Sequence, residues 1–223
     1  MKILSFSDSH IWKDKNPDII QALGEKIEER NPDILVAGGD IDDPWKSIWP
    51  EILNSPAHRE LERIVYRCIE LGKRVVVLRR NHDWDAKPSY LPGAEIMRQF
   101  KIGNQEYRHG DEFAMDWAVI GPAIFWMNTY FPQLMVPIYH ALYKTPTQVA
   151  GEEWNWKIGL IHLRAEAYAR KHKVNLDIGH THSPMRRHLG HGLFLTDRGD
   201  LEDSLSLVEV ELGKPPKFLW LKL

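Results

Sequence analysis

The sequence predicts an α/β fold, and three observations support that prediction. Strand-like and helix-like segments alternate over the first hundred of its 223 residues. The three strand-like runs in this part each end in polar side chains, and the C-terminal part is again rich in short strand-like runs. Alternating strands and helices indicate parallel strands joined by right-handed crossover connections.

The elements of the first half follow from the spacing of apolar residues. We expect strands at residues 2–7, 33–37 and 73–78, because each is a short apolar run. We expect helices at residues 17–30 and 57–71, where apolar side chains recur at helical spacing. Ligands bind at the carboxyl ends of strands in open α/β sheets, so the polar residues after the three strands should converge.

The second half begins with an apolar, aromatic segment at residues 117–143. Three prolines interrupt it, which argues against a transmembrane helix, since a spanning helix needs about 20 predominantly apolar residues. The segment is either a lid over a site or ordinary core. We then expect a helix at residues 152–171, a strand at 175–178, and terminal strands at 191–196, 204–211 and 217–221.

Composition narrows the class of protein. The formal net charge of −2 argues against nucleic-acid binding by bulk electrostatics, although a local basic patch stays open. Cys68 is the only cysteine, so nothing indicates disulfides or an oxidising compartment. The first strand begins too early for a signal peptide, which favours a cytoplasmic protein. We expect a single domain over residues 1–223, in which residues 117–150 are a possible lid or cap insert.

Five short motifs occur in a fixed order, and four of them come directly after strand-like runs. Each motif is weak alone, because a lone Asp-x-His pair arises by chance. Together they predict a metal site, since clustered carboxylates and imidazoles would cost free energy unless something compensated them. The motifs are Asp8-Ser9-His10, Gly39-Asp40-Ile41-Asp42-Asp43, Asn81-His82-Asp83, His109-Gly110-Asp111 and Gly179-His180-Thr181-His182.

The residue types of these motifs fit a pair of metal ions. Two divalent cations about 3.5–4 Å apart need a bridging carboxylate together with oxygen and imidazole ligands on each side. Mixed Asp, Asn and His ligands suit manganese, iron or zinc, and the absence of a thiolate argues against a structural zinc site. A water between two such cations becomes acidic enough to act as hydroxide near neutral pH. We therefore expect two divalent metal ions as cofactors, with manganese favoured over iron and zinc.

The order of the motifs resembles the calcineurin-like metallophosphoesterase superfamily over nearly the whole chain. The resemblance implies a four-layer α/β/β/α sandwich with an apolar lid-like insert, and hydrolysis of a phosphate ester or pyrophosphate by metal-activated water. It also implies a set of metal ligands: Asp8, His10 and His182 for one metal, Asn81, His109 and His180 for the other, and Asp40 as the bridge between them.

Four further residues are interpreted through the same resemblance. His82 would contact the phosphate and protonate the leaving oxygen, and Asp83 would orient His82. Asp43 occupies the outer acidic position of the family and would support a metal ligand. Arg80 stands where the family usually has Gly, and it either binds an anionic substrate or is simply tolerated.

His162 is an alternative to His109 as the fourth histidine of the site. His109 is followed by Gly-Asp and comes 27 residues after His82, as the family pattern expects. His162 lies within a helical run, where a structural role is the commoner one. The resemblance therefore favours His109.

Within the superfamily, the second half of the chain resembles the branch that contains UDP-2,3-diacylglucosamine pyrophosphohydrolase. An apolar insert would suit a lipid-bearing substrate, whereas an ordinary core at residues 117–143 predicts nothing about substrate. Leu201 departs from the pattern, since members of the branch usually have Trp there. The residues that carry the resemblance lie at 109–113, 169–171, 179–184, 188, 199–200 and 204–209.

Three functions stay open at this point. The first is a phosphodiesterase or pyrophosphatase for a nucleotide-linked substrate such as a UDP-sugar lipid. The second is a phosphomonoesterase or nuclease with the same metal centre, although a nuclease would need a basic groove. The third is a catalytically silent interaction scaffold. The expected partner is a small-molecule or lipid-linked phosphate substrate, with peripheral membrane contact open and nucleic acid not favoured.

Overall fold

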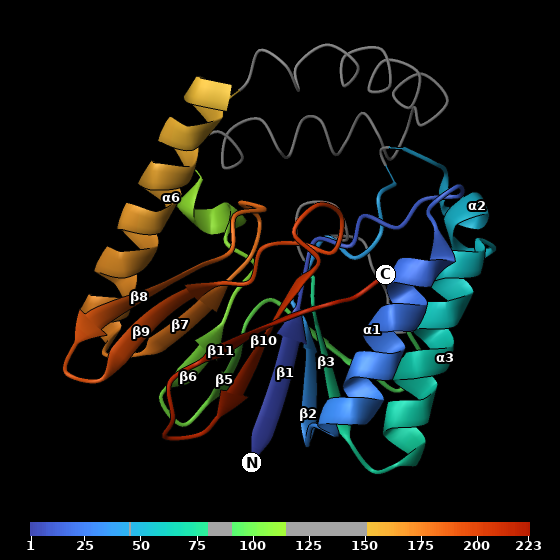
Figure 1. The fold of residues 1–223 in the computed structure, drawn as a ribbon, viewed down its shortest axis with the longest axis horizontal. Helices are drawn as coiled ribbons and strands as arrows, with labels where there is room; N and C mark the ends of the chain where they lie inside the picture. Colours follow the sequence, from blue (N-terminus) through green and yellow to red (C-terminus); the bar gives the residue numbers. More distant parts are fainter. Residues whose placement is uncertain (45, 80–90, 115–150) are drawn as a thin grey trace.

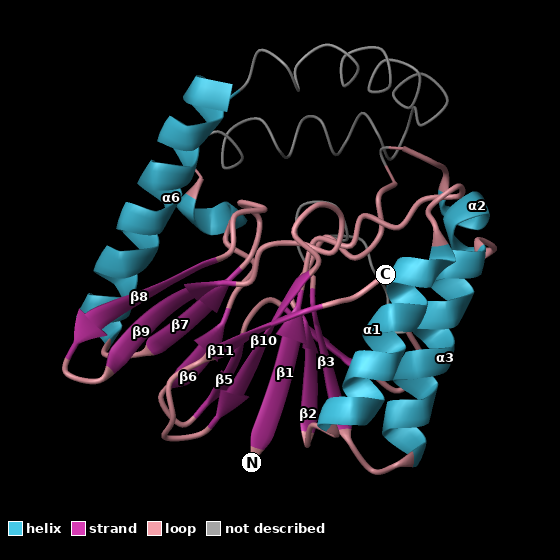
Figure 2. Cartoon of the chain, viewed as in Figure 1, coloured by secondary structure: helices cyan, strands magenta, loops and turns pink. Residues whose placement is uncertain are grey.

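The computed structural model describes residues 1–44, 46–79, 91–114 and 151–223, with side chains in the last range from residue 158 onward. Two β-sheets lie between helices on either side (Figures 1 and 2). Motif residues 81–83, Arg80 and the apolar segment at 117–143 fall outside the described residues. No helix in the described part of the chain is long and apolar enough to cross a membrane.

The first sheet has six strands. Strands β1 to β4 run parallel, β10 is antiparallel to β1, and β11 is antiparallel to β10. In spatial order the strands are β11 (Lys217–Trp220), β10 (Ser206–Glu211), β1 (Lys2–Phe6), β2 (Ile34–Ala37), β3 (Arg74–Leu78) and β4 (Glu95–Met97).

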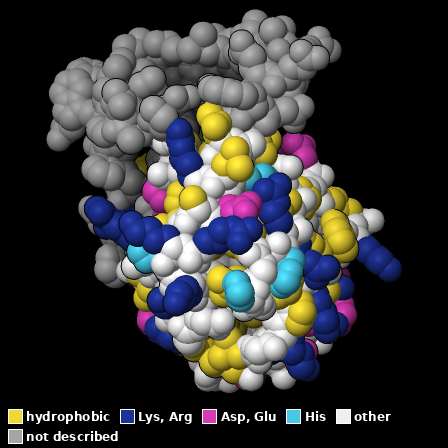
Figure 3. Space-filling model, turned by 90° about the vertical axis from the view of Figure 1, so that its left-hand side faces the viewer, with side chains coloured by type: hydrophobic (Ala, Val, Ile, Leu, Met, Phe, Trp, Pro, Cys, Tyr) yellow, Lys and Arg dark blue, Asp and Glu magenta, His cyan; other side chains and the backbone are white. Residues whose placement is uncertain are grey.

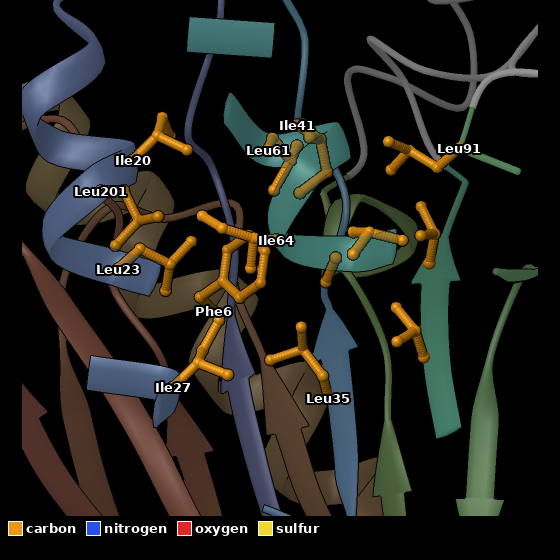
Figure 4. Close-up of a cluster of buried hydrophobic side chains, with 14 of the residues drawn as sticks. Phe6, Ile20, Leu23, Ile27, Leu35, Ile41, Leu61, Ile64, Leu91 and Leu201 are labelled. Atoms are coloured by element: carbon orange, nitrogen blue, oxygen red, sulfur yellow. The ribbon is translucent and has the colours of Figure 1, made fainter. Parts of the chain in front are cut away.

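Three helices accompany the first sheet: α1 (Pro17–Arg30), the short α2 (Trp49–Leu53) and α3 (Pro56–Glu70). Two of them begin at side-chain caps, because the Asn16 side chain accepts a hydrogen bond from Asp18 N and Ser55 accepts one from His58 N. Their apolar faces meet the sheet in one buried cluster, which Figure 4 shows. Its labelled members are Phe6, Ile20, Leu23, Ile27, Leu35, Ile41, Leu61, Ile64, Leu91 and Leu201.

The second sheet has five strands, and α6 (Gly151–His172) packs on its outer face beside the 3₁₀ turn η1 (Asp111–Phe113). Ala165 and Ala169 of α6 lie against Leu176 and Leu195 of the sheet. In spatial order the strands are β5 (Phe100–Ile102), β6 (Gln105–Tyr107), β7 (Asn175–Ile178), β9 (Leu193–Asp197) and β8 (Met185–Gly190).

A third buried cluster lies between the two sheets. It joins Ile3 and Val36 of the first sheet to Phe100 and Tyr107 of the second. The layers are therefore helix, sheet, sheet and helix, which confirms the four-layer α/β/β/α prediction.

The strands and helices that the sequence predicts are present, with ends that move by one or two residues. The helix at 17–30 and the strand at 175–178 coincide with α1 and β7. Of the C-terminal strands, β9 joins the second sheet, whereas β10 and β11 extend the first sheet. Strand β10 is buried on both faces and pairs with the edge of β1. Without β10, that edge of the first sheet would expose unpaired backbone groups.

Candidate metal centre

The loops that follow four strands meet at one end of the two sheets. Asp8 follows β1, Asp40 follows β2, His109 follows β6 and His180 follows β7. The two sheets are joined at this point, because the backbone N–H of His180 donates a hydrogen bond to Asp8 Oδ2 over 3.0 Å. The convergence that the strand ends predicted is therefore present in the described part of the chain.

Asp8, His10 and His182 form what we call the first cluster. Each offers one ligand-type atom, and these atoms lie within 4.8 Å of one another. The Nε2 atoms of His10 and His182 are 3.3 Å apart and face each other. Their Nδ1 atoms point away, toward Asp43 Oδ2 at 3.4 Å and Asp200 Oδ2 at 2.8 Å. A carboxylate lies on the Nδ1 side of each ring, and a neighbour of this kind favours the proton on Nδ1 and leaves the Nε2 lone pair for a cation.

Asp40, His109 and His180 form the second cluster, and its ligand-type atoms also lie within 4.8 Å of one another. His109 is fully buried, and its Nδ1 donates to the carbonyl oxygen of Gly38 over 3.1 Å. Its Nε2 lies 3.1 Å from Asp40 Oδ2. The backbone carbonyl here has the same orienting effect on the ring as the carboxylates of the first cluster.

The carboxylates of the centre raise the pKa values of two of its histidines against the effect of burial, whereas burial lowers the pKa of the third. Burial by itself would lower the pKa of His109, but Asp40 and Asp8 raise it to about 10. Burial likewise opposes the charged form of His182, and the Asp200 hydrogen bond and Asp8 raise its pKa to about 9. His180 behaves in the opposite way, because burial and the neighbouring His109 lower its pKa to about 3. The centre thus attracts positive charge.

The backbone at the centre adopts an uncommon conformation. Left-handed φ values in non-glycine residues cost about 1–3 kcal/mol each and persist only where the surrounding structure enforces them, often at functional sites. Five of the six cluster residues have such values: Asp8 (54°), His10 (43°), Asp40 (51°), His180 (70°) and His182 (56°).

The residues fit a pair of divalent cations. Asp8 Oδ1 is buried, and none of the described residues donates a hydrogen bond to it. It faces His182 Nε2 at 3.6 Å. A cation bound between this buried carboxylate oxygen and the imidazole nitrogens would compensate its charge. Oxygen and imidazole ligands together suit manganese, iron and zinc.

Sequence reasoning missed the role of Asp200. Its Oδ1 accepts hydrogen bonds from the backbone N–H groups of Glu202, Asp203 and Ser204 at 3.1, 2.8 and 2.7 Å, and its Oδ2 contacts His182. The Gly199-Asp200 dipeptide entered the sequence analysis only as part of the family resemblance, and nothing local to it pointed to His182, 18 residues earlier.

Two lysines compensate the acidic side chains behind the first cluster. Lys46 Nζ lies 3.5 Å from Asp43 Oδ2 and 3.4 Å from Glu202 Oε1, and Lys15 Nζ lies 3.5 Å from the same Glu202 oxygen. Burial lowers the pKa of Lys15 although Glu202 raises it. These contacts tie together the loops that carry His10, Asp43 and Asp200.

Two other histidines form buried pairs with carboxylates and belong to neither cluster. His58 Nδ1 lies 3.1 Å from Asp42 Oδ2, and His162 Nε2 lies 2.9 Å from Asp197 Oδ2. The structure therefore places His109, and not His162, among the cluster residues. Asn81, His82 and Asp83 fall outside the described residues, so their roles stay predictions.

Comparison with known proteins identifies the family. The model of the calcineurin-like phosphoesterase family matches residues 1–207. Comparison with curated proteins finds no match. Among solved structures, an archaeal phosphodiesterase is 14% identical over 98% of this chain and 99% of that chain, with a TM-score of 0.48.

Two other solved structures match with lower TM-scores. Yfce, a phosphoesterase from E. coli, is 16% identical over 95% of this chain and 89% of that chain, with a TM-score of 0.45. The nuclease MPE of Pseudomonas putida is 19% identical over 48% and 53%, with a TM-score of 0.38. Members of the matched family use divalent metals, in keeping with the two clusters. The chain belongs to the calcineurin-like phosphoesterase family and is a hydrolase that acts on phosphate esters.

Proposed function

We propose that the chain is a two-metal phosphodiesterase or pyrophosphatase. The observation that carries the proposal is the pair of ligand clusters joined by the hydrogen bond from His180 to Asp8. The first cluster would hold one cation and the second cluster the other. Asp40 would bridge them, and Asn81 would complete the second set. We propose manganese as the native metal, because oxygen and imidazole donors suit it.

The protein's contribution is to hold and orient groups around the scissile bond. When bound, two divalent cations would polarise a phosphoryl group and lower the pKa of a water molecule, so that hydroxide is available to attack phosphorus near neutral pH. Asp43 and Asp200 fix the rings of His10 and His182, so that both Nε2 atoms stay directed at the centre. His82 would give its proton to the leaving oxygen, with Asp83 orienting the ring.

The substrate class that we propose is a nucleotide-linked phosphodiester or pyrophosphate, such as a UDP-sugar lipid, met in the cytoplasm. Support comes from the sequence resemblance at residues 109–113 and 179–184. Leu201, the departure from that branch, is fully buried in the core beside Ile20 and Leu23. Leu201 is smaller than the Trp that is usual in the branch, and it packs in the core. The substrate proposal therefore rests on the other residues of the resemblance and needs a direct test.

A nuclease is the second candidate, and one observation favours it. Figure 3 shows Lys and Arg side chains gathered on the face at the α6 and β8 edge of the molecule. Exposed residues there include Arg170, Lys171, Lys173, Arg186 and Arg187. Glu166 is shared by Arg170 and Arg187, so the surface keeps a positive excess in a chain whose net charge is −2.

A substrate panel separates these candidates. The metal-free protein, reloaded with Mn²⁺, is assayed with bis-p-nitrophenyl phosphate, p-nitrophenyl phosphate, UDP-sugars and single-stranded DNA. We expect cleavage of the diester and of the pyrophosphate bond. Preference for DNA, lost at high salt, would instead support the nuclease. A protein inert toward every substrate would overturn the proposal in favour of a silent scaffold.

The bridging role of Asp40 is tested by Asp40→Ala. We expect loss of metal stoichiometry together with activity, because the change removes a ligand from both metals at once. Elemental analysis of the purified variant measures the stoichiometry. Asp18→Ala, at an exposed position in the first turn of α1, is the matched control and should keep both metals. Full occupancy of both sites in Asp40→Ala would rule out the bridge.

A further inference from the structure

His162 lies on α6, outside both ligand clusters, yet it is only 7% exposed. Its Nε2 is 2.9 Å from Asp197 Oδ2, which makes a charge-assisted hydrogen bond between the helix and the end of β9. The two partners are 35 residues apart in the sequence. Neither His162 nor Asp197 belongs to the two ligand clusters.

Asp197 also accepts a hydrogen bond from the loop that carries two of the cluster histidines, His180 and His182. It is fully buried, and the same Oδ2 accepts a hydrogen bond from Thr181 Oγ1 at 2.5 Å. Its Oδ1 accepts the backbone N–H of Gly199 at 3.1 Å. Thr181 Oγ1 in turn accepts the backbone N–H of Ser183 at 3.2 Å. A continuous hydrogen-bond chain therefore runs from α6 through Asp197 to Thr181, which lies in the turn at residues 180–182 (the 180–182 turn).

Thr181 occupies a position that matters to both clusters. It stands between His180, which belongs to the second cluster, and His182, which belongs to the first. Both neighbours have left-handed φ values, 70° and 56°, which the turn would not keep without outside restraint. The side chain of Thr181 is 1% exposed. A small rotation of this turn would move one ligand of each cluster at the same time.

We propose that His162 is a positioning residue of the metal centre, which acts through Asp197 and Thr181 to hold the 180–182 turn in the conformation that directs His180 and His182 at the two clusters. The inference rests on the proposed two-metal function. It differs from the contact between Asp200 and His182, which supports the first cluster alone. Breaking the His162 chain should weaken both metals together.

Two pairs of substitutions isolate the hydrogen bonds from the shape of the side chains. Thr181→Val keeps the shape and removes the hydroxyl, whereas Thr181→Ser keeps the hydroxyl. His162→Leu removes the N–H donor, whereas His162→Gln retains one near the position of Nε2. Mn²⁺ is titrated into each metal-free variant by calorimetry, and bound metal is counted by elemental analysis. Circular dichroism checks that each variant is folded.

We expect Thr181→Val and His162→Leu to weaken both Mn²⁺ binding events by about 10–100-fold, the usual effect of losing a partner behind a metal ligand. Thr181→Ser and His162→Gln should stay close to the wild type. Asp200→Asn should weaken one event only. Ile161→Val, which trims a buried side chain next to His162 without touching a hydrogen bond, should lower stability and leave Mn²⁺ affinity unchanged.

The outcomes separate the inference from the function on which it rests. Wild-type Mn²⁺ affinity in both Thr181→Val and His162→Leu would overturn the inference and leave the two-metal function intact. Equal weakening by Ile161→Val would also overturn it, because the effect would then be general packing. A wild-type protein that does not bind two Mn²⁺ ions would defeat the two-metal proposal itself. If His162→Leu fails to fold, the Thr181 pair alone decides.

Discussion

The ring nitrogen that points away from a cluster controls what the other nitrogen can bind. His10 and His182 each have a carboxylate behind Nδ1, whereas His109 has a backbone carbonyl. A carboxylate raises the basicity of an imidazole more than a carbonyl does, because it carries a full charge. Single residues outside the ligand sets therefore shape how strongly each cluster holds a cation.

Replacement of His82 should separate chemistry from metal binding. His82→Ala should keep both metals and lower kcat by about 10²–10⁴-fold, the usual contribution of a positioned acid. The fall should be smaller for nitrophenyl esters, because their leaving groups need little protonation. Steady-state kinetics with good and poor leaving groups, together with elemental analysis, provide the test. Loss of one metal would instead make His82 a ligand.

Metal binding at neutral pH should release protons. The pKa of His109 is raised to about 10 and that of His182 to about 9, so both rings are charged at pH 7.5 in the metal-free protein. A metal ligand must be neutral, so each ring loses its proton when a cation binds. Calorimetry of Mn²⁺ binding in buffers with different ionisation enthalpies should reveal this release, and affinity should rise with pH. An enthalpy that does not depend on the buffer would contradict the prediction.

The same shifts predict how the stability of the metal-free protein changes with pH. Both pKa values lie above the ordinary value of 6.5, so the folded state binds protons more tightly than the unfolded state. The resulting contribution to stability is complete below about pH 6.5 and is lost as the pH rises through 9 to 10. Urea midpoints should therefore fall between pH 7 and pH 10 in the metal-free protein, and much less in the Mn²⁺ form.

At the scale of elements, the strand ends can meet because glycines leave room between them. A Cβ on Gly39 would lie 2.9 Å from His109 Nδ1, and one on Gly110 would lie 2.9 Å from the Gly179 carbonyl oxygen. A Cβ on Gly179 would lie 2.6 Å from Asp8 Oδ2. The loops after β1, β2, β6 and β7 therefore lie so close together that the backbone of one contacts its neighbour. The two clusters depend on this close packing.

Gly179→Ala should destabilise the protein and weaken Mn²⁺ binding. The added Cβ would push on Asp8, and overpacking of this kind typically costs about 1–3 kcal/mol. Gly159→Ala is the matched control, since among the described residues a Cβ at this position in α6 meets no atom within 4 Å beyond the helix's own backbone, and the change should stabilise the protein by about 0.5–1 kcal/mol. Urea unfolding and Mn²⁺ titration of both variants provide the measurement. Wild-type stability in Gly179→Ala would show that the loops can move apart freely.

At the scale of the whole molecule, a buried ion pair connects the two sheets beneath the metal centre. Arg198 and Asp177 are both fully buried and lie 2.9 Å apart. Ser5 of β1 donates to Asp177 Oδ2 over 2.9 Å, and the Arg198 guanidinium packs against Gly38, which follows β2. The pair belongs to the second sheet and its neighbours to the first, so it links the two layers.

Removing one member of this pair should be more damaging than replacing both. Arg198→Met leaves an unpaired buried carboxylate, which typically costs about 3–5 kcal/mol. The double variant Arg198→Met with Asp177→Leu leaves no charge unpaired and should recover part of that loss. Urea unfolding of the metal-free single and double variants measures the difference. A double variant that is as unstable as the sum of the two single variants would exclude coupling between the residues.

The sequence by itself determined the helices and strands whose apolar side chains recur with a clear period. It also determined which metal-capable residue types directly follow several of the strands. The helix at 17–30 appears residue for residue as α1, and six of the seven proposed ligands lie in the two clusters, with Asn81 outside the described residues. Both observations, the match of α1 and the grouping of the six residues, have a local cause. Periodicity reports the burial of one face, and strand ends in a parallel sheet lie at one edge.

Only the tertiary structure decided which sheet each C-terminal strand joins and which groups stand behind the ligands. The short strand β8 carries Arg186, Arg187 and His188, a polar pattern that suits an exposed edge but gives no period from which to predict it. Likewise, β10 pairs with β1 from the other end of the chain, and His162 reaches Thr181 through Asp197. These pairings depend on contacts between residues that are far apart in sequence. The energies of such contacts cannot be predicted from a local sequence pattern.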